Sequence, residues 1–132
     1  MSRELFWLSL TLGATALFVF PYVLNRLVIR GLGGLLANPL PDDKPLAAWA
    51  QRAQRAHANA IENLAVFAPA ALAVHLLSLG NEGTAMACAA YFLARVLHYV
   101  AYTAGIVGVR TLAYLVGWAA TAWLIVRALG WV

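Results

Sequence analysis

The sequence predicts an all-α integral membrane protein: an up-down bundle of four transmembrane helices that forms a single domain over residues 1–132. Of these 132 residues, 64% are hydrophobic and only 11% are charged, whereas a soluble globular domain is about 45–50% apolar. Four apolar stretches each approach the ~20 residues that cross a bilayer as a helix. Little chain remains outside them, so any chemistry is expected in or beside the membrane.

The first span is predicted over residues 5–28. Its apolar core is longer than the ~7–15 residues of a signal-peptide core, it contains Pro21, and no convincing cleavage site follows, so we expect a retained helix. The segment Gly31–Pro45 is rich in glycine and proline, which interrupt helices, and we expect it to be irregular. Asp42 or Asp43 within it is expected to start the next helix, because carboxylate oxygens accept hydrogen bonds from unpaired N–H groups.

The three remaining spans are predicted over residues 46–79, 84–105 and 111–129. The second span is longer than the ~30 Å hydrocarbon core, so its first turns are expected to project into the cytoplasmic interface. Short connections at 81–83 and 105–108 make neighbouring helices antiparallel and adjacent. Alanine is frequent in the third predicted helix, which suits close helix packing in lipid.

The basic residues indicate topology more than a partner. The net charge is +4, but the basic residues are spread along the chain and mostly flank spans, so no nucleic-acid partner is expected. Loops one and three, with their edges, hold Arg26, Arg30, Lys44, Arg52, Arg55 and Arg110. The positive-inside rule then puts loops one and three in the cytoplasm and both termini outside. The short chain and the absence of a targeting signal favour a bacterial inner membrane.

Two polar stripes mark adjacent predicted helices. With about 100° per residue, one face of the second helix carries Arg52, Arg55, Asn59 and Glu62 within about 80° of one another. Helical spacing also gathers, on one face of the third helix, Tyr91, Arg95, His98 and Tyr102. His57 lies roughly opposite the first stripe, where it can serve another neighbour or subunit. A charge at the bilayer centre costs at least ~2.5–3.5 kcal/mol, so we expect the two stripes to face each other and form a site.

Parts of this pattern also have purely structural explanations. Arg52 and Arg55 can be ordinary cytoplasmic flanking charges, and Glu62 with Arg95 can be an ion pair that only satisfies two buried groups. Arginine, asparagine, glutamate and tyrosine together suit a ligand with carboxylates and amides, since arginine binds a carboxylate through two hydrogen bonds. The histidines lack partners at ligand spacing, so no metal is expected. Neither a Ser-His-Asp arrangement nor a glycine-rich phosphate loop is present.

The polar residues belong to longer motifs. The first reads Arg55-Ala56-His57-x-Asn59-x-x-Glu62-Asn63 and is followed by Phe67, and the second reads Ala94-Arg95-x-x-His98-x-x-Ala101-Tyr102, with Arg110 after a short loop. These motifs, together with Ala37-Asn38-Pro39 in the first loop, resemble the signature of the MAPEG superfamily, the membrane-associated proteins in eicosanoid and glutathione metabolism. Within it the match is closest to the microsomal glutathione S-transferases. The resemblance runs from about Arg30 onward.

The resemblance implies a homotrimer of four-helix subunits with glutathione bound between neighbours, toward the cytosol. It implies that glutathione is contacted by Arg55, Asn59, Glu62, Arg95 and Tyr102, with Arg30 or Arg26 from the adjacent subunit. Arg52, His57 and His98 complete the candidate binding set. Arg110 matches the arginine thought to stabilise the glutathione thiolate: a thiol of pKa ~8.5 is mostly protonated at pH 7, and a nearby cation favours the anion. Gln54 departs from the pattern, because the microsomal transferase has another arginine there, which puts one carboxylate contact in doubt.

Three functions are compatible with these residues. The favoured one is a membrane-bound glutathione-dependent transferase or peroxidase, in which the activated thiolate attacks lipophilic electrophiles or hydroperoxides. The second is a non-catalytic scaffold of the same superfamily that binds a lipid or another ligand in the same crevice. The third is a purely structural bundle with internal ion pairs. The first predicts consumption of the thiol, the second predicts ligand-dependent stabilisation without consumption, and the third predicts no ligand.

Overall fold

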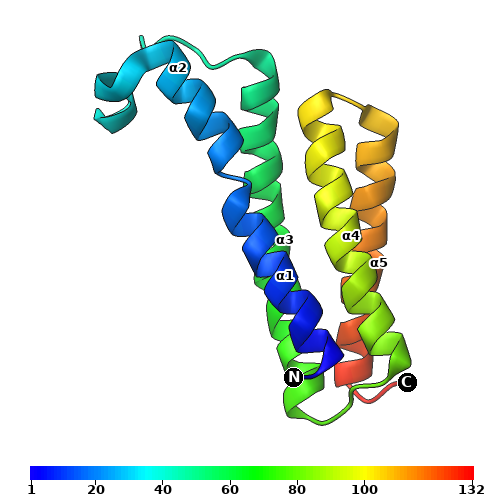
Figure 1. The fold of residues 1–132 in the computed structure, drawn as a ribbon. Helices are drawn as coiled ribbons and strands as arrows, with labels where there is room; N and C mark the ends of the chain where they lie inside the picture. The colour runs from blue at the N-terminus through cyan, green and yellow to red at the C-terminus, as the bar shows by residue number, and fades with distance from the viewer.

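The fold is a bundle of long helices without strands, described here for all residues 1–132 in a computed structural model. Its helices are α1 (Arg3–Leu17), α2 (Phe20–Leu36), α3 (Ala48–Leu76), α4 (Glu82–Ala104) and α5 (Val107–Ala128). Figure 1 shows α1 and α2 as one bent rod, with both termini at the end of the bundle that also holds the α3–α4 turn. Counting that rod once, four helical segments are long and apolar enough to cross a membrane. The predicted all-α fold with four spans is confirmed.

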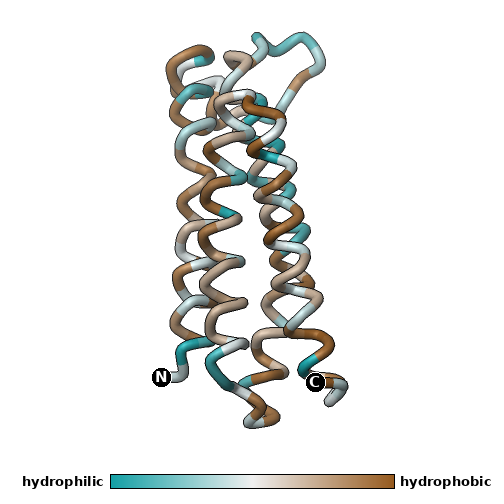
Figure 2. Tube along the Cα trace, turned by 90° about the vertical axis from the view of Figure 1, so that its right-hand side faces the viewer, coloured by the Kyte–Doolittle hydropathy of each residue, from teal (hydrophilic) through white to brown (hydrophobic).

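Hydropathy along the chain follows this arrangement. Figure 2 shows apolar residues along the whole length of the helices, whereas much of the connection at the upper end is hydrophilic. Many large apolar side chains on the helices are exposed, for example Leu93 and Trp118. Lipid is the natural neighbour of such surfaces, so the chain is an integral membrane protein.

The first span is bent where α1 meets α2, close to Pro21. Proline has no N–H to donate to the carbonyl of Leu17, four residues earlier, so the helical hydrogen bonding is interrupted there. Tyr99 of α4 donates its hydroxyl to the carbonyl of Phe18 at 2.9 Å. The Phe18 and Tyr99 rings also stack, with centroids 3.9 Å apart. The bend is therefore held in place by α4.

The glycines that follow interrupt the helix less than the sequence suggests. Helix α2 continues to Leu36, so the expectation of an irregular Gly31–Pro45 segment is wrong for its first part. Only Gly31 leaves helical geometry, with φ 68° and ψ −179°, a backbone conformation that glycine adopts without a steric penalty. The chain turns at this residue and then resumes a short helical stretch.

The start of α3 is also different from the prediction. Neither Asp42 nor Asp43 caps this helix: its first turn follows Ala47, whose N–H donates to the Asn25 side chain of α2 at 3.0 Å. Asp43 instead accepts a hydrogen bond from Arg30 at 2.8 Å. The N–H group at the start of α3 is therefore satisfied by an asparagine of a neighbouring helix and not by a local aspartate. Sequence spacing alone does not reveal such a contact between helices.

At the opposite end, α1 is attached to the start of α4. Asn81 and Thr84 form a reciprocal capping box there, in which each side chain satisfies a backbone N–H of the other residue. The Thr84 hydroxyl donates to the buried carboxylate of Glu4 at 2.6 Å. Arg3 and Glu82 add a two-bonded ion pair at 2.7 Å on the surface. We call the Glu4–Thr84 and Arg3–Glu82 contacts the α1–α4 latch.

The apolar core has two parts with polar side chains between them. One cluster surrounds Phe67 and Tyr91, whose rings stack with centroids 3.5 Å apart. The other surrounds Phe18 and Tyr99, against buried alanines of α3. Small side chains let helices approach closely in lipid. Along α4, Arg95 and His98 lie between the residues of the two clusters, and both are buried.

Candidate functional site

Arg95 is the centre of the candidate site. It is 2% exposed and lies about 14 Å from the C-terminal end of α4, at 1.5 Å per residue, which is deep within a hydrocarbon core ~30 Å thick. Its Nη1 donates to the Asn59 side chain of α3 and its Nη2 to the Tyr114 carbonyl of α5, both at 3.3 Å. The guanidinium also lies over the rings of Tyr91 and Tyr114, at 5.2 and 5.5 Å. Three helices therefore hold this one side chain.

None of these partners carries a negative charge. The ion pairs in the chain are Arg3–Glu82 and Arg30–Asp43, and the buried Nε of Arg95 has no hydrogen-bond partner at all. The structural explanation by a Glu62–Arg95 ion pair is therefore wrong for this chain: Glu62 lies on α3 but is exposed. A buried charge without a counter-ion is costly, so Arg95 is suited to an anion from outside the chain.

A cleft of about 410 Å³ opens beside Arg95, between α3 and α5. Its walls are formed by Asn59, Glu62, Asn63, Val66, Tyr114, Trp118, Thr121, Ala122 and Ile125. Asn59 is thus shared: it receives a hydrogen bond from Arg95 and lines the cleft. Glu62 brings a carboxylate to the same cleft. The arrangement presents an acid, two amides and a nearby guanidinium within the membrane.

Further along α4, toward its C-terminal end, lies a second group of polar side chains. Arg110 is in the first turn of α5, not in the preceding loop, because α5 begins at Val107. Its guanidinium lies 4.6 Å from the centre of the Tyr102 ring. That ring makes an edge-on contact with the imidazole of His98, centroids 5.6 Å apart. Arg110, Tyr102 and His98 therefore form one contiguous group, and the His98 ring also lies near Tyr114.

The remaining candidates of α3 divide between structure and solvent. Arg52 donates through Nε to the carbonyl of Thr103 at 2.9 Å, so it binds the C-terminal end of α4, where unpaired carbonyls favour a cation. This agrees with a structural role for Arg52. Arg55 is exposed and makes no side-chain hydrogen bond within the chain. Only Asn59 of the predicted α3 stripe actually meets the α4 stripe, through Arg95.

Two other candidates lie apart from Arg95. His57 faces α2, where its Nδ1 shares a hydrogen bond with the Tyr22 hydroxyl at 2.9 Å. The sequence predicted that His57 lies off the α3 stripe and serves another neighbour. In the structure that neighbour is α2, the second half of the first span. Arg30 lies at the α2–α3 connection, where it donates to Asp43 and to the carbonyl of Lys44, both at 2.8 Å. Neither residue reaches the cleft within one chain.

The chain matches a known protein family along most of its length. The model described as MAPEG family matches residues 5–130. The chain belongs to the MAPEG family. No curated protein and no solved structure matches it. The MAPEG family includes glutathione-dependent transferases and related proteins, and the matched range contains every candidate residue of both polar stripes.

Sequence reasoning missed the α5 side of the candidate site. Tyr114 supplies both a carbonyl and a ring to Arg95, and Gly117 and Thr121 follow on the same helix. A signal for them exists in the sequence: Arg110, Tyr114, Gly117 and Thr121 follow spacings of four, three and four, which places them on one helical face. The stripe is inconspicuous because tyrosine, glycine and threonine are ordinary in an apolar helix.

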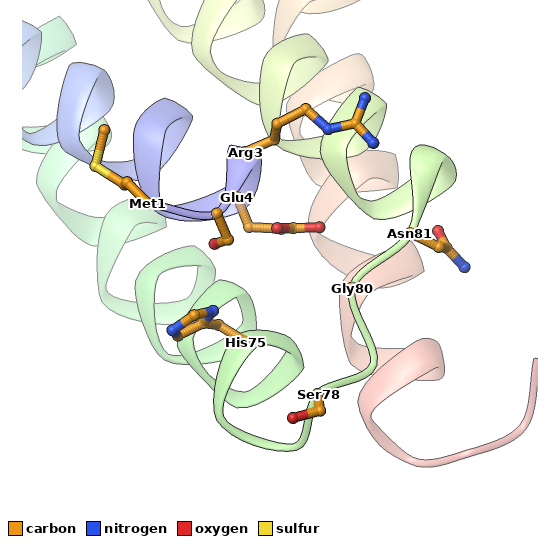
Figure 3. Close-up of a pocket in the computed structure, with 8 residues that line it drawn as sticks. Met1, Arg3, Glu4, His75, Ser78, Gly80 and Asn81 are labelled. Carbon is orange, nitrogen blue, oxygen red and sulfur yellow. The ribbon is translucent and has the colours of Figure 1, made fainter.

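The MAPEG chain also has a polar pocket at the other end of the bundle. Figure 3 shows this pocket, of about 480 Å³, where the start of α1 meets the α3–α4 turn. Arg3 and Glu4 line it, but both already have partners in the α1–α4 latch. His75 lies in its wall without a hydrogen bond to another side chain. We therefore assign this pocket to the latch and not to the candidate site.

Proposed function

We propose that this MAPEG protein is a membrane-bound glutathione-dependent transferase or peroxidase of the microsomal glutathione S-transferase type. The observation that carries the proposal is the buried guanidinium of Arg95, which has no carboxylate partner and lies beside a polar cleft within the membrane. Arginine is permanently charged and binds carboxylates through paired hydrogen bonds. Glutathione offers two carboxylates, an ammonium group and two peptide groups.

The residues around the cleft match these groups in kind. Arg95 and the exposed Arg55 suit the two carboxylates, and Glu62 suits the ammonium group. Asn59 can donate to a peptide carbonyl through its amide nitrogen while its oxygen accepts from Arg95. The buried His98 and then Tyr102 continue the line of polar side chains toward Arg110. These charged groups with an amide among them suit a ligand that has charges at both ends and amides between them.

Arg110 is the residue proposed to act on the thiol. A cation close to the sulfur favours the thiolate over the thiol, and each unit by which the thiol pKa falls is worth ~1.4 kcal/mol. In a transferase reaction the thiolate forms an S–C bond with the electrophile and the leaving group departs with its electron pair. In a peroxidase reaction two glutathione molecules reduce one hydroperoxide to an alcohol and water, and glutathione disulfide is formed.

The proposed assembly is a homotrimer, as the family resemblance implies. Glu62 is exposed on α3 within a single chain, although a charged group facing lipid at the bilayer centre costs at least ~2.5–3.5 kcal/mol. Further copies packed against α3 would remove that cost and enclose the cleft. Arg30 would then approach the glutathione of an adjacent subunit.

The proposed location is a bacterial inner membrane with loops one and three in the cytoplasm and both termini outside. The support is the distribution of basic residues, which favours the end of the bundle formed by the α2–α3 and α4–α5 connections. Arg52 and Arg110 lie at that end. Glutathione would then enter the site from the cytoplasm.

A non-catalytic scaffold that binds a lipid in the same crevice is the second candidate. It is favoured by an apolar groove of about 470 Å³ between α3 and α5, which shares Val66 and Ile125 with the polar cleft. An amphiphile could place its polar end in the cleft and its chain along the groove. The two candidates differ in one measurable property, which is whether the thiol is consumed.

The test is glutathione binding to the purified, detergent-solubilised protein, followed by ultraviolet difference absorbance in the thiolate band and by turnover with a lipophilic electrophile. Arg110→Ala is expected to abolish the thiolate signal and turnover while largely retaining glutathione affinity, and Arg55→Ala is expected to weaken binding. Arg3→Ala is the matched control, because Arg3 is an exposed arginine in the α1–α4 latch at the other end. Binding without thiolate or turnover supports the scaffold, and no binding at millimolar glutathione excludes the proposed chemistry.

A further inference from the structure

Gly117 of α5 lies directly against the Arg95 guanidinium. A Cβ atom built on Gly117 would be 2.9 Å from Nε and 3.0 Å from Cζ of Arg95, and closer still to Nη2. Real Cβ atoms essentially never approach other heavy atoms to less than 3.0 Å. Arg95 and any side chain at position 117 therefore compete for the same space.

The backbone does not require a glycine at this position. Gly117 lies in the interior of α5, and its φ is outside the left-handed region that favours glycine. In a helix interior glycine is less favourable than alanine. Its presence at position 117 is therefore explained by the space that it leaves and not by the conformation that it adopts.

The space beside Gly117 also makes a backbone carbonyl oxygen accessible to Arg95. The Tyr114 carbonyl, which accepts from Nη2 of Arg95, belongs to the residue one turn before Gly117. Helix carbonyls point along the axis toward the residues three and four positions later, so a side chain at position 117 would stand next to this oxygen. Glycine leaves the oxygen accessible from the side, and Arg95 approaches it there.

We propose that Gly117 is a positioning residue of the candidate site: the space left by its missing side chain seats the Arg95 guanidinium against α5. This position of the guanidinium against α5, which we call the Arg95 seat, fixes where its charge meets a ligand carboxylate beside the cleft. The ligand part of the inference rests on the proposed glutathione function. The seating of Arg95 does not, because it concerns contacts within the chain.

The experiment compares Gly117→Ala with the unaltered full-length protein in detergent. Alanine at position 117 is expected to displace the guanidinium, to lower the thermal unfolding midpoint despite its better helix propensity, and to raise the Kd for glutathione at least about tenfold through loss of a charge-assisted hydrogen bond. Gly13→Ala is the matched control, since Gly13 lies inside α1 and a Cβ there meets nothing within 4 Å. It is expected to leave the Kd for glutathione unchanged and to keep or raise the unfolding midpoint, because alanine is more favourable than glycine in a helix interior.

A double-mutant cycle with Arg95→Gln separates seating from general packing. With the guanidinium gone, Gly117→Ala is expected to cause no further loss of glutathione affinity and to leave the unfolding midpoint unchanged or higher. If the single Gly117→Ala variant fails to fold, recovery of folding in the Arg95→Gln background supports the seat. Equal destabilisation in both backgrounds, or no effect in either, overturns it. If the unaltered protein binds no glutathione, the proposed function fails, while the unfolding midpoints still decide the role of Gly117.

Discussion

At the residue scale, the chain surrounds one buried positive charge with neutral partners only. Arg95 is bound by an amide oxygen and a backbone carbonyl and lies over two aromatic rings. Such partners solvate a guanidinium without neutralising it. The charge therefore stays available to an anion, at the cost of stability in the empty protein.

Replacing Asn59 by aspartate tests this trade-off. Asn59→Asp would put a carboxylate at the oxygen that accepts from Arg95 and neutralise the guanidinium within the chain. The unfolding midpoint is expected to stay the same or rise, and the affinity for glutathione is expected to fall by at least about tenfold, or 1.4 kcal/mol. Thermal unfolding and equilibrium binding measure the two effects.

Asn63→Asp is the control for this charge. Asn63 lines the same cleft one turn away, donates to Asn59 and has no hydrogen bond to Arg95. It should weaken binding less than Asn59→Asp does. If both variants lose the same affinity, general repulsion explains the effect and pairing with Arg95 does not.

Sequence patterns predict on which face of a helix a residue lies better than they predict which residue it contacts. The stripes on α3 and α4 correctly brought Asn59 to Arg95, because residues on facing stripes of adjacent helices meet. They failed for Glu62, since a stripe about 80° wide also includes side chains that point past the neighbouring helix. Gly117 could not be recognised because what matters there is the space it leaves beside a residue of another helix.

At the element scale, α4 organises the bundle. It packs against α1, α3 and α5, accepts Arg52 at its C-terminal end, and holds the bend of the first span through Tyr99. The number and type of the spans follow from hydropathy, so the sequence predicts them. Pro21 marks the position of the bend in the sequence, whereas the contact with Tyr99 of α4 that holds it is tertiary and is not visible there. The continuation of α2 to Leu36 was missed because only Gly31 leaves helical geometry in this glycine-rich stretch.

The bend gives a prediction for Tyr99→Phe. The variant keeps the ring that stacks on Phe18 and removes only the hydroxyl that donates to the Phe18 carbonyl. Loss of this buried hydrogen bond is expected to cost about 1–3 kcal/mol, measured as a shift in the denaturant or thermal midpoint. Tyr102→Phe is the comparison, because its hydroxyl has no hydrogen bond within the chain, and its midpoint is expected to stay constant. Equal midpoints for both variants would contradict the role of Tyr99.

At the scale of the whole molecule, a single chain leaves charged groups of α3 uncovered. Glu62 and Arg55 are exposed on a helix long enough to cross the membrane. A face of this kind is better satisfied by protein than by lipid. The face of α4 around Leu93, by contrast, is apolar and is lined by hydrophobic residues of α4 and α5 alone, which suits lipid.

Cysteine cross-linking distinguishes these two faces. Cys88 is the only cysteine and is buried, so a Cys88→Ala background with one new cysteine reports a single position. Ile61→Cys, beside Glu62, is expected to form a cross-linked dimer of chains on mild oxidation in the membrane, whereas Leu93→Cys is expected to stay monomeric on a denaturing gel. Cross-linking at Leu93 with none at Ile61 would place the contact between copies on α4 and refute the arrangement.

The α1–α4 latch also sets an order of events during biosynthesis. Glu4 and Thr84 are 80 residues apart, so at ~5–20 residues per second the hydroxyl leaves the ribosome roughly 4 to 16 s after the carboxylate. During that interval the carboxylate of Glu4 lacks the hydroxyl to which it is bonded in the complete chain. Synthesis of α4 ends this stage, because the same helix supplies first Thr84 to Glu4 and then Tyr99 to the bend. A nascent chain stalled before α4 therefore lacks both of the contacts that hold the two ends of α1.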